Sequence, residues 1–163
     1  MTEPQAAVPA AECLFQSVID FDTESERVSA FVTMLFRNAG SEPIEQPRII
    51  LSVSPSRSCD ISGKILSPQL IPAFSVYGKD GRKSGWSFAE DEWFANGKVT
   101  GEYNIQSIEP LTMPPGVWLE MPDFHVSCAL DSLRNGPLAI HGLVEAGEAR
   151  FPVLNPIHIH CSF

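Results

Sequence analysis

Basic residues are scarce in this chain, and their scarcity excludes one class of partner. The 163 residues include 11 lysines and arginines against 20 aspartates and glutamates, so the formal net charge is −9. No cluster of lysine or arginine offsets that charge. An acidic surface repels the phosphates of nucleic acids and the anionic face of a membrane. We therefore expect neither nucleic acid nor an anionic membrane surface among the partners.

Long apolar runs are missing as well. No stretch approaches the roughly 20 apolar residues that span a bilayer, and residues 1–10 lack the basic and apolar segments of a signal peptide. We expect a soluble, cytoplasmic protein without a membrane span, with unconventional export or incorporation into a larger assembly as alternatives. Residues 1–10 are expected to form a flexible N-terminal arm, either disordered or ordered against a neighbouring subunit, and residues 11–163 to form one domain.

The motifs that identify the common enzyme classes are also absent. The chain has no G-x-S-x-G, no P-loop and no G-x-G-x-x-G, so we predict no cofactor and no catalytic residue, although a missing motif does not exclude an enzyme. The cysteines lie far apart and form no C-x-x-C pair, which argues against a zinc knuckle and a thioredoxin-like site. We expect them to be free, buried thiols, with disulfides as the alternative outside the cytoplasm. They are Cys13, Cys59, Cys128 and Cys161.

Alternating apolar residues are present where helical periodicity is not. No stretch repeats apolar side chains at the i, i+3, i+4, i+7 spacing of a helix. Alternation with a period of two instead recurs over residues 28–36, 49–53, 99–105, 138–144 and 157–163, and it predicts strands with one buried face. We expect the core to include these members of the alternating faces: Val32, Met34, Phe36, Leu51, Val53, Tyr103, Ile105, Ile140 and Ile159.

Turn-forming residues separate the predicted strands. Asn96-Gly97 lies between two apolar runs and predicts a hairpin turn, and Asp80-Gly81 is a second dipeptide that accepts the positive φ of such turns. Asn135-Gly136-Pro137 and Pro114-Pro115-Gly116 mark two further breaks. Short strands with frequent turns and no crossover helices predict an all-β fold, an antiparallel β-sandwich of the immunoglobulin-like or jelly-roll-like kind.

Two segments carry a likeness to a known kind of module. A strand ends in Asn-x-Gly at Phe36 to Gly40 and is followed by an apolar strand between Pro47 and Pro55. Later, Pro114-Pro115-Gly116 leads into an edge-like strand over residues 117–121. This pattern resembles the immunoglobulin-like modules of the CARDB and related bacterial or archaeal type. The resemblance implies an adhesive, spacer or assembly role and supplies no catalytic residues.

Two histidines near residue 160 could share a metal ion. In a strand, His158 and His160 point to the same face, and two imidazoles at that spacing can bind one metal ion. His125 and His141 could supply further ligands if their strands pair nearby. The alternative is that both histidines belong to an ordinary polar surface.

The acidic residues 20–26 form a candidate calcium site, because their first acids match the first ligand positions of an EF-hand loop. Ser25 stands where that loop has its glycine, and Phe31 where it has its final glutamate. No helix is expected on either side. We favour a turn whose acids are solvated.

A third candidate is the acidic run Glu90-Asp91-Glu92. It lies beside Trp86, Phe88, Trp93 and Phe94. Carboxylates next to aromatic rings occur in sugar-binding and glycosidase clefts. Aromatic residues at alternate positions more often pack in a core, and we favour that interpretation.

The sequence therefore predicts a non-enzymatic structural or protein-interaction β-sandwich subunit that assembles with itself or with a protein partner. The alternative is a small metal- or carbohydrate-binding jelly-roll protein. Residues 13–19 are apolar enough to add a strand to a neighbouring sheet, but we favour the interpretation that they form the first strand of their own sheet. If residues 1–10 drive assembly, their removal should give a smaller species with the fold intact.

Overall fold

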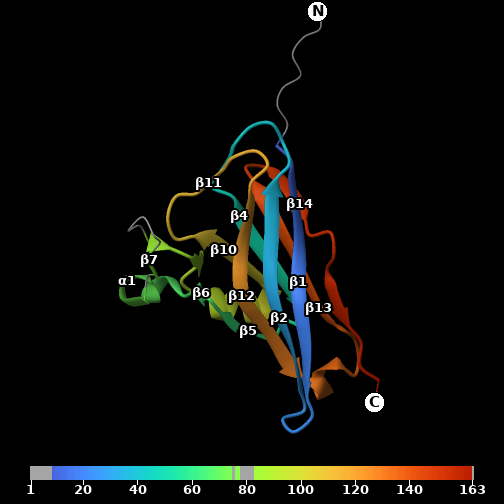
Figure 1. Cartoon of the computed structure of the whole chain (residues 1–163). Helices are drawn as coiled ribbons and strands as arrows, with labels where there is room; N and C mark the ends of the chain where they lie inside the picture. The colour runs from blue at the N-terminus through green and yellow to red at the C-terminus, as the bar shows by residue number, and fades with distance from the viewer. Residues whose placement is uncertain (1–8, 75, 78–82, 163) are drawn as a thin grey trace, which may run out of the picture.

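Two β-sheets pack face to face in the structure, a computed structural model that describes residues 9–74, 76–77 and 83–162. The smaller sheet has four strands in the order β1-β2-β12-β5. Their bounds are β1 Ala11–Asp22, β2 Arg27–Asn38, β12 Trp118–Ala129 and β5 Asp60–Gly63. This sheet lies in front in Figure 1, with β1 at one of its edges.

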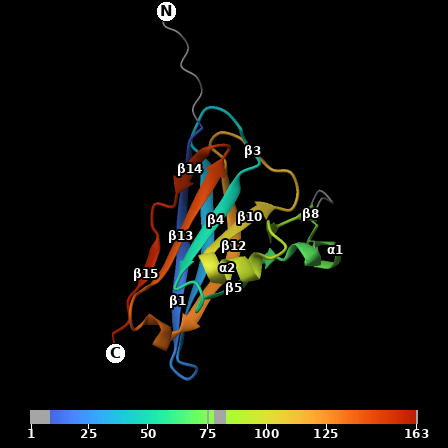
Figure 2. The ribbon, with the colours of Figure 1, turned by 180° about the vertical axis from the view of Figure 1, so that it is seen from behind.

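The larger sheet has seven strands. It faces the viewer in Figure 2, which shows the molecule from behind. Its order is β14-β13-β4-β10-β9-β6, and β15 also pairs with β13. The bounds are β14 Ala149–Pro152, β13 Leu138–Ala146, β4 Arg48–Ser54, β10 Glu102–Ser107, β9 Trp86–Phe88, β6 Ile65–Leu66 and β15 Ile157–Ile159. The fold is thus an all-β sandwich, as the sequence predicts.

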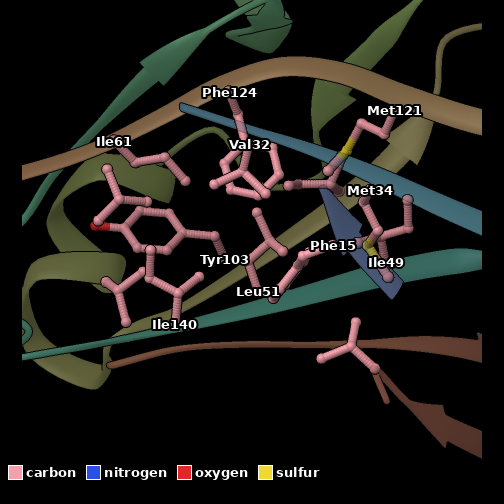
Figure 3. Close-up of a cluster of buried hydrophobic side chains, with 14 of the residues drawn as sticks. Phe15, Val32, Met34, Ile49, Leu51, Ile61, Tyr103, Met121, Phe124 and Ile140 are labelled. Carbon is pink, nitrogen blue, oxygen red and sulfur yellow. The ribbon is translucent and has the colours of Figure 1, made fainter. Parts of the chain in front are cut away.

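Alternating side chains from both sheets fill the space between them. In β2 every second residue from Val28 to Asn38 is buried, because successive side chains of a strand point to opposite faces. Figure 3 shows Val32 and Phe124 of the smaller sheet meeting Leu51 and Tyr103 of the larger one. The nine predicted core residues are all buried: Val32, Met34, Phe36, Leu51, Val53, Tyr103, Ile105, Ile140 and Ile159.

Shorter elements connect the two sheets. They are β3 Ile44–Glu45, the 3-10 helix η1 Pro68–Leu70, α1 Ile71–Phe74, β7 Val76–Tyr77, β8 Lys83–Ser84, α2 Trp93–Thr100, β11 Thr112–Met113 and η2 Leu130–Leu133. β3 pairs with β11, and β7 pairs with β8. Among the described strands all pairings are antiparallel except that of β6 with β9, which is parallel.

The predicted hairpin at Asn96-Gly97 is wrong, because both residues lie inside α2. The helix ends at Thr100 and is capped by Gly101, which has the left-handed φ of 78° and donates its N–H to the carbonyl of Gly97 (2.8 Å). Glycine at position 97 also leaves room for the ring of Tyr103, which a Cβ there would meet at 2.2 Å. The strand expected over residues 99–105 accordingly begins only at Glu102.

Other predicted boundaries have mixed outcomes. The breaks at Asn135-Gly136-Pro137 and Pro114-Pro115-Gly116 are confirmed, since both stand between elements. Residues 13–19 belong to β1, the first strand of their own sheet. The last strand is shorter than expected and ends at Ile159. Asp80-Gly81 lies outside the described residues, and so does most of the N-terminal arm.

The α-helix α2 closes one side of the sandwich. Its Lys98 ammonium donates to the carbonyl of Cys59 and to the carboxylate of Asp60, both at 2.7 Å. These contacts join the helix, which packs against β10, to the start of β5 in the other sheet. Within residues 9–74, 76–77 and 83–162, none of the helices has the length and apolar character needed to cross a bilayer.

Candidate functional site

The free edge of the smaller sheet, formed by β1, is covered along only part of its length. The N–H of Leu154 donates to the carbonyl of Cys13 at 2.9 Å. The side chain of Asn155 accepts from the N–H of Phe15 and donates to its carbonyl, both at 2.8 Å. One amide side chain therefore satisfies both main-chain groups of Phe15, in the way a neighbouring strand would. The covered part of the edge ends there.

Beyond that point the edge is open. The bond from the N–H of Ala39 to the carbonyl of Ala10 (2.8 Å) sets the pairing of β1 with β2, so the even-numbered residues of β1 bond to β2. The main-chain groups of Ser17, Ile19 and Phe21 point the other way and bond to no other described residue. Such a row of unpaired N–H and C=O groups is a template for another strand.

Exposed apolar side chains accompany the open edge. Val18 is 68% exposed, Phe21 52% and Phe31 42%. Val18 lies directly opposite Phe31 in the ladder, and Phe31 lies opposite His125, so the three form a row across the outward face. The rings of Phe31 and His125 meet edge to face with centroids 4.5 Å apart. The row gives the outward face an apolar centre.

A hollow of about 300 Å³ opens beside this row. Its walls include Val18, Phe31, His125 and Asp123. The rings and the aliphatic side chain supply apolar wall, and the carboxylate of Asp123, which is ion-paired with Lys64 (2.7 Å), supplies a polar one. A side chain of a docked segment would fit such a hollow.

A β-bulge in β12 shapes one wall of the hollow. The register with β2 shifts between Met121 and Phe124, and Asp123 has a positive φ of 52°. Gly63 of β5 faces the bulge, and a Cβ at Gly63 would lie 2.1 Å from the carbonyl oxygen of Asp123. Only a glycine lets the two strands approach this closely.

A second apolar group lies farther along the same outward face. Leu14 and Leu35 are cross-strand partners and are both half-buried. The guanidinium of Arg37 lies 5.2 Å from the centre of the Trp118 ring and forms an ion pair with Glu12. Trp118 itself is 47% exposed. Tryptophan and arginine are enriched among the residues that dominate protein–protein binding.

The end of the open edge is acidic. Asp20, Asp22, Glu24 and Glu26 lie at the end of β1 and in the turn that follows, and all four are exposed. The carboxylate of Asp22 accepts from Ser25 and from the N–H of Glu24 (3.0 Å), and these bonds lower its pKa. No three potential metal ligands gather in any part of the chain that the structure describes. The candidate calcium segment is therefore a turn capped by its own aspartate.

The two histidines predicted as metal ligands have different neighbours. His158 of β15 lies on the outward face of the larger sheet, where its Nε2 is 3.2 Å from Nε2 of His141 on β13. His160 follows the end of β15 and is exposed. His125 lies on the other sheet, beside Phe31. The structure thus brings His158 together with His141, which sequence reasoning gave only as a further ligand.

The aromatic residues near the third candidate belong mainly to the core. Trp93 stacks on Phe88 with ring centroids 3.8 Å apart, and its indole N–H donates to the hydroxyl of Ser67 (2.9 Å). Trp86 is 8% exposed, whereas Phe94 is 55% exposed. The core interpretation is borne out for Trp86 and Phe88, whereas Trp93 is half-buried and packs against the core.

One acid of that candidate, Glu90, serves local structure. The carboxylate of Glu90 accepts hydrogen bonds from the amides of Asn96 (2.7 Å) and Asn104 (2.8 Å), which lower its pKa. Trp86 and Glu120 line a separate hollow of about 530 Å³. Among its described lining residues Glu120 is the one carboxylate, whereas glycoside hydrolysis usually needs two that face each other.

The sequence allows residues 13–19 to add as a strand to a neighbouring sheet, but the open edge of β1 itself is not among its predictions. The available signal was the composition of β2, whose outward face mixes Phe31 and Leu35 with polar residues. A strand that carries large apolar side chains on both faces has a second surface to cover. Which main-chain groups stay unpaired depends on Asn155, 140 residues away from Phe15, and no local pattern indicates that contact.

Comparisons with known proteins add little to what the structure itself shows. No family model matches the chain, and no curated protein matches it. One similar solved structure is described as the crystal structure of a FixG-related protein from Vibrio parahaemolyticus. It is 11% identical and has a TM-score of 0.42, with 93% of this chain and 97% of that chain covered. A likeness at this level supports no statement about the function of this chain.

Proposed function

We propose that this chain is a protein-interaction domain that takes up an extended segment of a partner protein along the open edge of β1. The observation that carries the proposal is the row of unpaired main-chain groups at Ser17, Ile19 and Phe21. A partner strand would pair with these groups, and its side chains would lie over Val18 and the neighbouring row.

The covered half of the same edge supports this mode of binding. Leu154 and Asn155 already bond to Cys13 and Phe15 as a short added strand would. A partner segment would continue that pairing from Ser17 onward. Natural proteins usually protect a long free edge with charge, proline or a covering loop, and here the protection stops in the middle of a 12-residue strand.

The outward face next to the edge supplies the side-chain contacts. The apolar row of Val18, Phe31 and His125 borders the hollow of about 300 Å³, which would receive one apolar side chain of the segment. Main-chain pairing would contribute affinity, and this hollow would contribute specificity.

Charge identifies the chemistry of the partner. The chain carries a net charge of −9, and four exposed acids surround the end of the open edge. A second copy of the chain would bring the same charge to this edge, which disfavours self-pairing. The segment that fits is therefore extended, apolar at alternate positions, and rich in lysine or arginine at the others.

Hydrogen exchange with a designed peptide tests this proposal. The probe is a nine-residue peptide of alternating valine and lysine. Its addition should slow the exchange of the amides of Ser17, Ile19 and Phe21, because an added strand accepts their hydrogens. The same peptide, N-methylated at every residue, carries methyl groups along both of its edges, so it cannot pair and should give no protection. Equal protection by both peptides, or protection only elsewhere, would contradict the proposal.

Ser17 offers a matched pair of variants. Its N–H points away from β2, so Ser17→Pro removes an edge donor without breaking the ladder. Ser17→Pro should weaken peptide binding by at least about tenfold, and Ser17→Ala should bind within about twofold of the unchanged protein. A dimer in light scattering that Ser17→Pro converts to a monomer would place a second copy at the edge instead, and would overturn the basic partner.

A second candidate function is the binding of a transition metal at His141 and His158. Their Nε2 atoms are 3.2 Å apart. Two imidazoles that bind one Zn²⁺ tetrahedrally, with Zn–N bonds of about 2.0–2.1 Å, place their nitrogens roughly 3.3 Å apart. The separation of the two rings therefore suits one shared ion, with water in its other positions.

Calorimetric titration with Ni²⁺ or Zn²⁺ tests whether the metal binds to His141 and His158 or to His158 and His160, the pair expected from the sequence. His141→Gln and His158→Gln should each weaken binding at least about tenfold, because one remaining imidazole holds the ion poorly. His125→Gln and His160→Gln are the matched controls and should change binding less than about twofold. A loss in His160→Gln with no loss in His141→Gln would favour the original pairing of His158 with His160.

A further inference from the structure

Two buried cysteines face each other across neighbouring strands of the smaller sheet. Cys128 lies in β12, and Cys59 directly precedes β5. The antiparallel register pairs Ser127 with Asp60, so the next step along the ladder places Cys128 opposite Cys59. Residues directly opposite each other have Cα atoms roughly 4.5–5.5 Å apart, which lies within the range of about 4.4–6.8 Å that a disulfide needs.

Both thiols point into the same small region of the core. Each residue is 0% exposed, and each thiol is free. Cys128 shares the inward face of β12 with Phe124 and Val126, and Cys59 shares that of β5 with Ile61. The two side chains therefore lie side by side on the inward face, at a Cα separation that a disulfide can span.

The environment distinguishes the two sulfurs. A hydrogen bond from the Cys59 thiol lowers the pKa of Cys128, and the charge of Arg27 lowers it further. The same hydrogen bond and burial raise the pKa of Cys59. Cys128 is therefore the group that loses its proton first and can act as the nucleophile.

The other two cysteines have different surroundings. The Cys13 thiol donates to the carbonyl of Phe151 at 3.2 Å, and burial raises its pKa to about 11. Cys161 is partly exposed and follows the end of β15. Cys13 lies in β1 and Cys161 lies after β15, so both serve as internal controls for the facing pair.

We infer that Cys59 and Cys128 form a reversible disulfide between β5 and β12 when the protein meets a low-molecular-weight disulfide. The thiolate of Cys128 attacks one sulfur of the oxidant, its S–S bond breaks, and one thiolate leaves. Cys59 then loses its proton, and its sulfur attacks Sγ of Cys128 and displaces the second thiolate. The protein loses two protons and two electrons, and the oxidant becomes two thiols.

The position of the link indicates what it would do. β5 is a four-residue strand at the edge of its sheet, and its first residue, Asp60, together with the preceding Cys59, holds Lys98 of α2. Short edge strands open locally more easily than central ones, which gives an oxidant access to the buried pair. The disulfide would then fasten this edge and the helix that closes the sandwich.

Peptide mapping of the full chain tests the inference. The protein is equilibrated with oxidised glutathione, and remaining thiols are alkylated under denaturing conditions before digestion. We expect Cys59 and Cys128 in one cross-linked peptide pair and an alkyl group on Cys13 and Cys161. The thermal midpoint should rise by about 5–15 °C and return after treatment with dithiothreitol.

Cysteine variants complete the test. Cys13→Ala and Cys161→Ala should keep the rise in thermal midpoint, whereas Cys59→Ala should lose it. Peptide mapping of the unchanged protein decides the matter even if a variant fails to fold. Alkylation of all four thiols after oxidation, a cross-link through Cys13 or Cys161, or glutathione adducts on Cys59 and Cys128 without a link would each overturn the inference.

Discussion

Phe36 shows how much a single buried residue contributes to this sandwich. Its side chain is fully buried, and its ring meets Trp86 edge to face with centroids 5.8 Å apart. Phe36→Ala removes these contacts and leaves a cavity, so it should lower the free energy of unfolding by about 3–5 kcal/mol. Chemical denaturation measures the change.

The control for Phe36 is an exposed residue. Leu154 is 73% exposed, so Leu154→Ala should change the free energy of unfolding by less than about 0.5 kcal/mol. If Phe36→Ala lost less than about 1 kcal/mol, the alternating face of β2 would not be the core. The alternation of β2 makes Phe36 predictable from sequence, because burial on one face repeats at every second residue.

Asp60 makes stability depend on pH. Its carboxylate lies 2.7 Å from Lys98 and 3.2 Å from Arg27. The hydrogen bond from Lys98, together with the charges of Lys98 and Arg27, holds the pKa of Asp60 below its usual value of 3.8. A lowered pKa in the folded state stabilises the protein above the usual value, and this stabilisation is lost as the pH falls through the lower one.

Asp60→Asn should therefore lower the free energy of unfolding at neutral pH, and its difference from the unchanged protein should vanish in acid. Urea denaturation at pH values from 7 to about 2 measures this difference. The matched control is Asp91→Asn, because Asp91 forms no ion pair with a described residue. The interpretation fails if the two variants show the same dependence on pH.

At the scale of elements, α2 is where sequence reasoning went wrong. Asn96-Gly97 is a frequent hairpin dipeptide, yet here Gly97 lets the ring of Tyr103 approach the helix backbone. Tyr103 is 1% exposed, and Trp93 of the same helix stacks on Phe88. Tertiary packing thus decides the conformation of a segment whose local preference is a turn.

Gly97→Ala separates these two effects. Alanine favours a helix over glycine by about 1 kcal/mol, but its Cβ would lie 2.2 Å from Cε1 of Tyr103. We expect the clash to dominate and to lower the free energy of unfolding by about 1–3 kcal/mol. Val99→Ala in the same helix, where the side chain is 71% exposed, should cause little loss. A Gly97→Ala protein as stable as the original would contradict the close contact.

The candidate site was less predictable than the strands that form it. β1 could be predicted as a strand from residues 13–19, because its pattern is local. Its half-covered edge could not, because Asn155 comes from the other end of the chain. The histidines differ in the same way. His158 and His160 share a local spacing, whereas the close pair joins β13 to β15 across 17 positions.

At the scale of the whole molecule, the repeated alternation of apolar residues predicts the fold class, because every layer must bury one face of its strands. The net charge of −9 acts at the same scale, since it creates a field around the open edge rather than a single contact. If a basic segment binds there, its affinity should fall as salt screens that field. The contribution of the charges near the edge to peptide affinity can be measured by comparing variants that remove charges near the edge with variants that remove them far from it.

The double variant Asp20→Asn/Glu24→Gln removes two exposed acids at the end of the open edge. It should weaken binding of the valine–lysine peptide by about threefold to tenfold at low salt, because each exposed charge contributes only modestly. Asp91→Asn/Glu102→Gln removes the same charge at positions away from β1 and should have less than half that effect on the binding free energy. Fluorescence anisotropy at increasing salt should bring all three proteins to a common affinity. Equal losses in the two double variants would show that the peptide responds to net charge alone and does not lie along β1.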